Sequence, residues 1–255
     1  MTDHDFSAPR LFIPAAISAG ATIALDKAQA NYLGNVLRLS AGDTVLIFNG
    51  RDGEWAARVE QGGRRVVGLM PERQVRPQPA APDLVYLFAP LKHARLDYMV
   101  QKAVEMGAGV LAPVLTRRTQ VARVNLERME ANAVEAAEQC GILAVPAVRE
   151  PVRLDDALAQ LEPERLLVFC DEGAPVADAI AALTQAEGRA REAGIAVLIG
   201  PEGGFDPAER NLILARPRTL RLSLGPRILR ADTAAVAALA VVQAALGDWN
   251  ASVSE

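Results

Sequence analysis

Two short loops near the C-terminus constrain the fold of this chain most strongly. Residues 199–205 read Ile-Gly-Pro-Glu-Gly-Gly-Phe, and residues 224–234 read Leu-Gly-Pro-Arg-Ile-Leu-Arg-Ala-Asp-Thr-Ala. Each follows an apolar run typical of a buried parallel strand, Ile195–Ile199 or Leu220–Leu224, and each precedes a helical pattern. Glycine beside proline at the carboxyl end of a strand gives a tight turn whose main-chain groups can reach a ligand. Two such loops predict one shared pocket in an open α/β sheet.

Neither loop fits the common nucleotide-binding fingerprints. A Rossmann site requires G-x-G-x-x-G, and a P-loop ends in Gly-Lys-Ser or Gly-Lys-Thr. Here Gly203-Gly204-Phe205 has no lysine after it, and Gly225 stands alone. One such turn would be an ordinary strand-to-helix connection, whereas the pair favours a dedicated site.

The two loops resemble the signature loops of the SPOUT-class methyltransferases. More narrowly, residues 199–205 and 222–234 resemble the family that methylates N3 of a uridine in bacterial 16S ribosomal RNA. The resemblance spans nearly the whole chain, because it extends to Arg10-Leu11-Phe12-Ile13, Val36-Leu37-Arg38 and Glu135-Ala136-Ala137-Glu138-Gln139. One departure concerns Ala231-Asp232, where the family usually carries Thr-Glu. The charge is kept on a shorter arm and a hydroxyl is lost.

A domain boundary is predicted near residue 73. Residues 69–82 contain four prolines and little apolar sequence, which we expect to interrupt helix and sheet. Upstream, a helix at 27–37 and strands with hairpin turns predict a small β-rich domain, the strands being 44–48, 55–59 and 65–69. The resemblance implies that residues 1–72 form a PUA-like RNA-binding β-barrel, followed by a linker over 73–82.

The remainder of the chain, residues 83–255, alternates between strand and helix patterns. Strands are predicted at 84–89, 110–115, 166–169, 195–199 and 220–224. Helical segments are predicted at 96–104, 126–140, 177–183, 212–215 and 234–246. This alternation predicts an α/β fold with a mostly parallel sheet and helices on both faces. The resemblance further implies a SPOUT-type domain with a trefoil knot around the cofactor.

Composition limits the other classes of function. The net charge of −4 argues against a protein that coats nucleic acid indiscriminately, although a local basic stripe can still bind RNA. Cys140 and Cys170 are too few for a disulfide framework, and we expect both to be core thiols. With only His4 and His93 beside them, no metal site is expected. The polar N-terminus and the lack of a long apolar run predict a cytoplasmic protein.

The resemblance implies S-adenosyl-L-methionine as the cofactor, held largely by main-chain groups of the two loops. The residues that it assigns to the cofactor are Leu198, Ile199, Gly200, Pro201, Gly203, Gly204, Leu222, Ser223, Leu224, Gly225, Ile228 and Leu229. The loop after Phe169, around Cys170–Gly173, is expected to form a third wall.

Three charged residues are the candidates for catalysis. Methyl transfer to uracil N3 requires that its proton be removed or that developing charge be stabilised. Arg230 is predicted to stabilise that charge, because a guanidinium can donate two hydrogen bonds to a planar acceptor. Asp232 is predicted to orient Arg230. The alternative is that this pair only ties the helix N-terminus to the loop. Glu202 is a proton acceptor, an RNA contact or simply an acid in a first helical turn.

RNA binding requires several cations acting together. The phosphate-contact candidates are Arg10, Arg38, Lys92, Lys102 and Arg117. The resemblance implies a homodimer, and the Ala- and Val-rich segment 234–246 suits burial in the knot or in a dimer interface. The implied substrate is 16S ribosomal RNA within the small subunit.

Two other functions remain open from the sequence. One is a different SPOUT enzyme that methylates a ribose 2′-hydroxyl or another base. The second is a non-catalytic RNA-binding or ribosome-assembly protein. Intact glycine loops with Arg230 argue against that second alternative.

Overall fold

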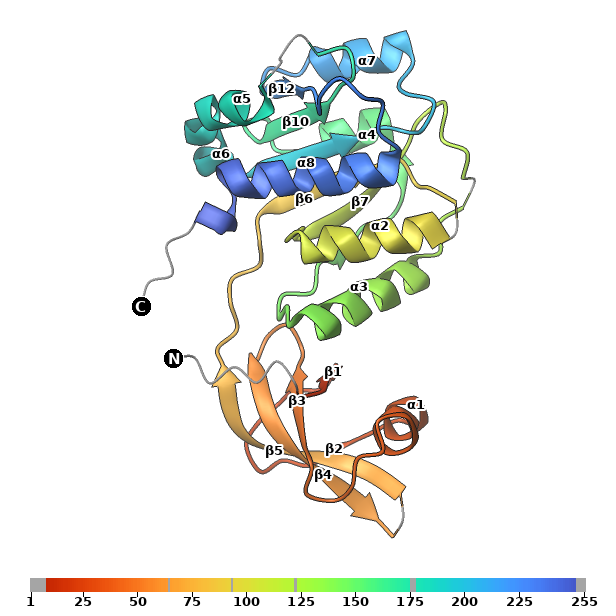
Figure 1. Cartoon of the computed structure of the whole chain (residues 1–255), viewed down its shortest axis with the longest axis vertical. Helices are drawn as coiled ribbons and strands as arrows, with labels where there is room; N and C mark the ends of the chain where they lie inside the picture. The colour runs from red at the N-terminus through yellow and green to blue at the C-terminus, as the bar shows by residue number, and fades with distance from the viewer. Residues whose placement is uncertain (1–7, 64, 93, 122, 175–177, 251–255) are drawn as a thin grey trace. The chain divides into compact units, whose positions relative to one another are not determined.

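The computed structural model of the chain describes residues 8–63, 65–92, 94–121, 123–174 and 178–250 (Figure 1). The chain divides into two units. The first is drawn from Met1–Ala80 and Ala137–Val145, and the second from Ala81–Ala136 and Pro146–Glu255.

The first unit is built on a five-stranded sheet with the order β1-β3-β4-β5-β2. Its strands are β1 (Arg10–Phe12), β2 (Ile23–Ala24), β3 (Thr44–Phe48), β4 (Glu54–Gly62) and β5 (Arg65–Arg76). β1 and β3 are parallel, and the other pairs are antiparallel. Asn49 closes the β3–β4 hairpin, because its Oδ1 accepts from the backbone N of Arg51 and Asp52 at 3.0 and 2.8 Å. The predicted β-rich domain is therefore confirmed.

The helix predicted at 27–37 is two short segments. Helix α1 (Lys27–Asn31) begins with a capping box, in which Asp26 accepts from the backbone N of Gln29 at 2.8 Å and Gln29 accepts from that of Asp26 at 3.2 Å. A π-helical turn, η1 (Tyr32–Val36), follows and buries Leu33 in the core of this unit. Arg38 then turns the chain with φ of +58°.

Strand β5 runs through part of the segment predicted as a boundary and linker. Pro71 lies within this strand, opposite Ala57, and the register shifts between Ala56 and Ala57. A bulge of this kind is where a sheet tolerates proline, since the ladder is already interrupted there. The Pro71 carbonyl still accepts from the backbone N of Gly20 at 2.8 Å. The expectation that residues 69–76 interrupt the sheet was therefore wrong.

A buried charge cluster lies in the same unit. The side chain of Glu54 is fully buried, and its carboxylate accepts from Arg10 Nε at 2.9 Å and from Arg76 Nε at 2.6 Å. Burial opposes ionisation of Glu54, but the hydrogen bonds and charges of Arg76 and Arg10 outweigh it and lower its pKa. Arg10 itself is only 8% exposed. The interpretation of Arg10 as a phosphate contact was therefore wrong, because its guanidinium neutralises a buried acid.

The second unit contains one parallel sheet with the order β12-β10-β11-β6-β7-β8, and β9 also pairs with β7. Its strands are β6 (Leu84–Phe88), β7 (Val110–Leu115), β8 (Ala147–Val148), β9 (Val152–Arg153), β10 (Leu166–Cys170), β11 (Ile195–Ile199) and β12 (Thr219–Leu222). Its helical segments are α2 (Ala94–Glu105), most of α3 (Leu126–Cys140, which ends within the first unit), α4 (Leu154–Ala159), α5 (Ala179–Gln185), α6 (Glu187–Ala193), α7 (Pro207–Leu214), α8 (Ala231–Leu246) and the 3-10 turn η2 (Asp248–Asn250).

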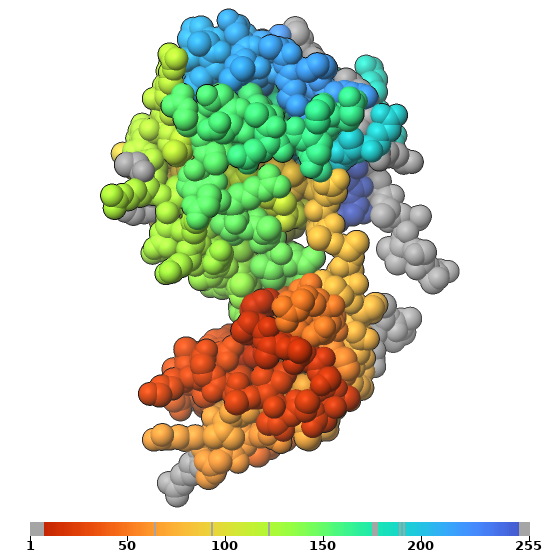
Figure 2. Space-filling model, turned by 180° about the vertical axis from the view of Figure 1, so that it is seen from behind, coloured from red at the N-terminus to blue at the C-terminus, as the bar shows by residue number. Residues whose placement is uncertain are grey.

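Helices cover both faces of this sheet. Along β6, Val85 and Leu87 join a core cluster that includes residues of α4 and α7, whereas Tyr86 and Phe88 stack on the other face with ring centroids 4.9 Å apart. α8 packs on α2, α5 and α6, in front of the sheet in Figure 1. Figure 2 shows the opposite side, where the green and blue segments of α4 and α7 lie. The predicted α/β fold with a parallel sheet is confirmed, and the trefoil knot stays a prediction.

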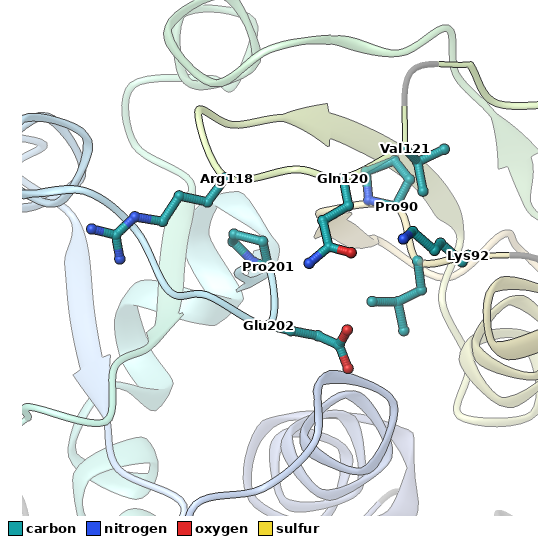
Figure 3. A pocket seen from close by; sticks show the side chains of 8 residues that line it. Pro90, Lys92, Arg118, Gln120, Val121, Pro201 and Glu202 are labelled. Carbon is teal, nitrogen blue, oxygen red and sulfur yellow. The ribbon is translucent and has the colours of Figure 1, made fainter.

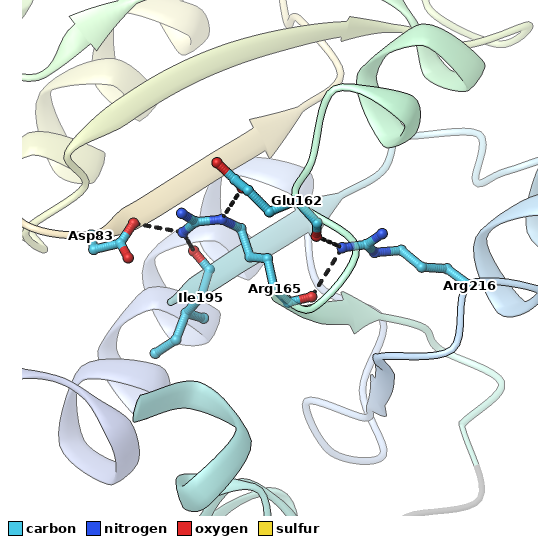
Figure 4. A network of polar contacts seen from close by, with 5 residues as sticks. All are labelled: Asp83, Glu162, Arg165, Ile195 and Arg216. Carbon is cyan, nitrogen blue, oxygen red and sulfur yellow. Dashed lines mark hydrogen bonds and ion pairs between the residues drawn. The ribbon is translucent and has the colours of Figure 1, made fainter. Parts of the chain in front are cut away.

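A second buried arginine ties the amino ends of the central strands together (Figure 4). Arg165, 7% exposed, forms ion pairs of 2.6 Å with both Asp83 and Glu162, and its Nη1 donates to the Ile195 carbonyl at 3.3 Å. Gly194 makes room for this network, since a Cβ there would lie 2.1 Å from Asp83 Oδ2. The network therefore fixes the sheet edge opposite the loops at the strand carboxyl ends.

The predicted elements agree closely with the observed ones in this unit. β7 and α3 have the predicted bounds, whereas β12 ends at Leu222 rather than Leu224. The predicted helix start at Ala177 lies outside the described residues. The sequence patterns missed α4, α6 and the two-residue strands β8 and β9, which are too short for a clear period.

Replacing Glu54 with Gln should destabilise the first unit by about 3 kcal/mol, because Arg10 and Arg76 would both lose the charge of the buried carboxylate that they contact. Urea titration followed by Trp55 fluorescence measures this. Since the pKa of Glu54 is lowered in the folded state, its stabilising contribution is present above the ordinary glutamate pKa. That contribution is lost as the pH falls through the folded-state pKa of Glu54. The free energy of unfolding of the variant should not show this decrease.

The matched control is Glu72→Gln. Glu72 pairs with Arg58 at 2.9 Å, but the two side chains are 42% and 48% exposed. The decrease in the free energy of unfolding should therefore stay below about 1 kcal/mol. Equal losses for the two variants would contradict the proposed role of the buried pair.

Candidate active site

A cleft of about 580 Å³ lies at the carboxyl ends of β10, β11 and β12. It is lined by residues of three loops, 170–173, 199–205 and 224–229, and by the first turn of α8. This volume is typical of small-molecule sites, which range over roughly 300–1,000 Å³. The two glycine-proline loops therefore share one pocket, as the sequence predicts.

Glycine lets an aromatic ring close over the loop after β11. A Cβ on Gly200 would lie 2.5 Å from the ring of Phe205, whose other neighbour is Phe169 with ring centroids 5.4 Å apart. The turn closes when the backbone N of Gly204 donates to the Pro201 carbonyl at 2.8 Å, with φ of +69° at Gly204. One wall of the cleft is therefore main chain backed by aromatic rings.

Most residues that the resemblance assigns to the cofactor line this cleft. Those that do are Ile199, Gly200, Pro201, Gly203, Gly204, Leu222, Leu224, Gly225, Ile228 and Leu229. Leu198 does not, because the alternation of β11 turns its side chain into the core cluster, where it is 0% exposed. Ser223 is not among the lining residues either.

The wall after β10 is held by a buried carboxylate. Asp171 Oδ2 accepts from Arg210 Nη2 and Arg221 Nε, both at 2.8 Å, and Oδ1 accepts from the backbone N of Gly173 at 3.0 Å. Burial opposes ionisation, but the bonds from Arg210 and Arg221 outweigh it and lower the pKa of Asp171. This arrangement fixes the position of the third loop.

The two cysteines have different environments. Cys170 lines the cleft, and burial raises the pKa of its thiol to about 12, so it stays protonated and is a poor nucleophile. Cys140 is exposed, so the expectation of a core thiol was wrong there. His4 and His93 lie outside the described residues.

Arg95, in the first turn of α2, bridges both candidate acids. Its Nε donates to Asp232 Oδ2 at 3.0 Å and its Nη2 to Asp232 Oδ1 at 3.2 Å, while Nη1 donates to Glu202 Oε1. The hydrogen bond from Arg95 is the main cause of the lowered pKa of Asp232. One guanidinium therefore links the loop after β11 to the start of α8.

This contact corrects the predicted partner of Asp232. The acid pairs with Arg95, and no ion pair of the Arg230 side chain occurs within the described ranges. Arg230 is the N-cap of α8 and is exposed; its backbone carbonyl accepts from Ala234 N at 2.8 Å. The Arg230 guanidinium is therefore available to a ligand.

The other predicted RNA contacts differ in their environments. Arg38 and Lys92 are exposed. Arg117 has a 68% exposed side chain paired with Asp206 at 2.9 Å. Lys102 Nζ contacts both carboxylate oxygens of Glu105 at 2.6 and 2.7 Å. Arg38, Lys92 and Arg117 are thus open to solvent, whereas Lys102 is engaged within its own helix.

Sequence reasoning missed Arg95 and Arg118. Arg118 lines the cleft and donates to the Gly203 carbonyl at 2.6 Å. Both follow parallel strands closely, Arg95 after β6 and Arg118 after β7, and the carboxyl ends of such strands meet at one edge. Attention to charged residues just beyond each strand could have found them.

The described residues offer neither a membrane-spanning helix nor a cluster of metal ligands. No helix there combines the length and apolar character needed to cross a membrane. No group of three or more His, Cys, Asp or Glu side chains in those ranges is placed to hold a metal ion.

Comparison with known proteins relates this geometry to a class of enzymes. Residues 78–243 match the family model described as an RNA methyltransferase domain, and residues 25–67 match an RNA methyltransferase PUA domain. The ribosomal RNA small subunit methyltransferase E of Synechocystis is 32% identical over 234 residues, which cover 89% of this chain and 74% of the relative. Its counterpart from Rickettsia conorii is 28% identical over 235 residues, 92% of this chain and 94% of the relative.

Two solved structures share the fold over nearly the whole chain. The ribosomal RNA small subunit methyltransferase E of Neisseria gonorrhoeae, bound to S-adenosyl methionine, has a TM-score of 0.82 and 26% identity, covering 95% of this chain and 100% of its own. A putative methyltransferase of Legionella pneumophila in complex with the same cofactor has a TM-score of 0.76 and 28% identity, covering 93% and 98%.

Fold, cleft and family model together define an RNA methyltransferase with a PUA domain. Within that class, the chain belongs to the ribosomal RNA small subunit methyltransferase E family.

Replacing Arg95 with Gln should raise the pKa of Asp232 toward the ordinary aspartate value, because the hydrogen bond that favours the carboxylate is lost. Carboxyl-carbon NMR titration of Asp232 measures the change. Arg128→Gln is the control, since Arg128 donates hydrogen bonds of 2.9 and 2.6 Å to Asp97 of α2 and does not contact Asp232. An unshifted Asp232 in the Arg95 variant would contradict the bridge.

Proposed function

We propose that this protein transfers a methyl group from S-adenosyl-L-methionine to N3 of a uridine in 16S ribosomal RNA. The observation that carries the proposal is the cleft at the carboxyl ends of β10, β11 and β12, walled by the two glycine-proline loops. Family membership supports the same chemistry, and two relatives of the same fold are bound to this cofactor.

The cleft fits the cofactor in size and in chemistry. Its wall combines apolar side chains such as Phe169 and Leu224 with main chain at Gly200 and Gly225, which suits an adenine ring recognised by backbone groups. When bound, the cofactor supplies a methyl group on positively charged sulfur, so the protein needs only to orient the base and manage its proton.

We assign distinct roles to three charged residues: Glu202, which lines the cleft, and Arg230 and Asp232, which adjoin its lining residue Ala231. The exposed guanidinium of Arg230 stabilises charge that develops on the uracil, since it can fork onto a planar acceptor. Asp232, paired with Arg95, anchors the first turn of α8 rather than orienting Arg230. Glu202, on the edge of the cleft, accepts the proton.

The proposed partners follow from the substrate. Arg38 and Arg117 are solvent-exposed cations that contact RNA phosphates, and ribosomal RNA as substrate implies a cytoplasmic enzyme. We also propose a homodimer, because α8 leaves apolar side chains such as Val236 and Val241 only half-buried. Light scattering of the purified chain tests the dimer.

Calorimetric titration with S-adenosyl-L-methionine tests the cleft. The wild-type protein should bind one molecule per chain, and Gly200→Ala should weaken binding at least tenfold because the new Cβ displaces the Phe205 ring. Gly188→Ala is the control, since a Cβ at this position in α6 meets nothing within 4 Å. Unchanged affinity in the Gly200 variant would remove this loop from the site.

Arg230→Ala should lower the rate of methyl transfer to small ribosomal subunits by about 10²–10³-fold, as expected for loss of one charge-stabilising group. Affinity for S-adenosyl-L-methionine and the melting temperature should change little, because the Arg230 side chain forms no cap hydrogen bond at α8. Arg230→Lys should restore the rate of methyl transfer only in part, since an ammonium group lacks the planar pair of donors that a guanidinium presents to one acceptor. Near-normal transfer by the alanine variant would exclude Arg230 from the mechanism.

A further inference from the structure

A second, smaller hollow lies beside the cleft (Figure 3). This notch is formed by the loop after β6 (Pro90–Lys92), the loop after β7 (Arg118–Val121) and Pro201-Glu202. It shares Arg118, Pro201 and Glu202 with the cleft. A base edge held in the notch and a cofactor held in the cleft would therefore meet at these shared residues.

The walls of the notch combine apolar surface with three polar side chains. Pro90, Leu91 and Val121 provide the apolar part. Figure 3 shows the Lys92 amine, the Gln120 amide and the Glu202 carboxylate turned toward one opening. Lys92 and Gln120 are exposed, and neither side chain forms a hydrogen bond or ion pair within the described ranges. Two donors and one acceptor are therefore available to a ligand.

This set of groups matches the imide edge of uracil. That edge presents a carbonyl, an N–H and a second carbonyl, and it is complemented by two donors and one acceptor. Cytosine presents an unprotonated N3 instead. This atom is an acceptor, so it could not form a hydrogen bond with the Glu202 carboxylate. A ribose hydroxyl would need only one of the three groups. The groups of the notch are therefore complementary to uracil rather than to cytosine or a ribose hydroxyl.

One carboxylate oxygen of Glu202 is available for this contact. Arg95 donates to its Oε1, and no hydrogen bond to Oε2 occurs within the described ranges, so one carboxylate oxygen stays open toward the notch. The enclosed volume of about 20 Å³ exceeds the roughly 10–15 Å³ that one water requires but is far below that of a base. The notch therefore takes the polar edge of a base whose ring lies across its mouth.

We propose that the notch is the acceptor site for the target uracil, in which Lys92 and Gln120 donate to its two carbonyls and Glu202 accepts the N3 proton. This inference rests on the proposed function and adds the residues that choose the base. The N3–H proton passes to the Glu202 carboxylate, and the N3 electron pair forms the new N–CH₃ bond. The electron pair of the broken S–CH₃ bond stays on sulfur, and Glu202 then returns its proton to solvent.

Three variants test the site: Glu202→Gln, Gln120→Ala and Lys92→Met. For each, we would measure kcat and KM for small ribosomal subunits that lack the methyl group, the Kd for S-adenosyl-L-methionine, and the melting temperature. Matched controls are Glu164→Gln, an acid that pairs with Arg218 at 2.5 Å, and Gln160→Ala, at the exposed C-cap of α4.

The expected results separate the three roles. Glu202→Gln should lower kcat by about 10²-fold, as for loss of a general base, with little change in KM. Gln120→Ala and Lys92→Met should each lower kcat/KM about tenfold, the effect of one lost hydrogen bond to a substrate. Cofactor affinity and melting temperature should stay within error of the wild type, and both controls should keep kcat/KM within about twofold.

Other outcomes overturn the proposal in distinguishable ways. A wild-type protein that neither binds the cofactor nor methylates RNA would refute the proposed function itself. An active wild type with all three variants within twofold of it would refute the notch alone. Parallel loss of activity, cofactor affinity and melting temperature in Glu202→Gln would assign Glu202 to structure. Mass analysis that finds the methyl on cytosine or on ribose would refute the uracil edge while leaving methyl transfer intact.

Discussion

The parallel register of four adjacent strands is the constraint on which the site depends. β6, β11, β10 and β12 lie side by side and parallel, and Leu198 is level with both Leu87 and Phe169, while Cys170 is level with Leu222. The carboxyl ends of these strands therefore meet at one edge, and every loop that leaves them enters the same space. An antiparallel arrangement would send alternate loops to the opposite edge and leave no shared cleft.

The sequence predicted those parts of the site that are encoded locally. A short apolar run followed by glycine and proline specifies a strand end and a tight turn within about seven residues, so both loops and their common cleft were predictable. Leu198 was assigned to the cofactor on the family resemblance, but strand alternation turns its side chain into the core. Pro71 was taken as a sheet breaker, because a bulge depends on the partner strand and cannot be read from one segment.

The charge pairing could not be predicted, because its partners are distant in sequence. Arg10 meets Glu54 across 44 residues, and Arg95 meets Asp232 across 137. A cation counted from sequence as an RNA contact is indistinguishable from one that neutralises a buried acid. Arg10 is of the second kind, as are Arg210 and Arg221, which contact the buried Asp171. The basic residues left for RNA are consequently fewer than composition suggests, which agrees with a net charge of −4.

The enclosure of Arg165 has a consequence for behaviour in salt. Dissolved ions screen exposed charges within about 10 Å at 0.1 M, but they cannot enter around a guanidinium that is 7% exposed. Binding to ribosomal RNA through exposed cations weakens steeply as salt rises, because it depends on counterions released from the phosphates. In the clamp across the amino ends of β6, β10 and β11, the Arg165 guanidinium is buried, whereas the carboxylates of Asp83 and Glu162 are 64% and 63% exposed. The strands themselves are held by a buried apolar core. A rise in ionic strength should therefore weaken RNA binding more than it weakens the sheet that carries the cleft.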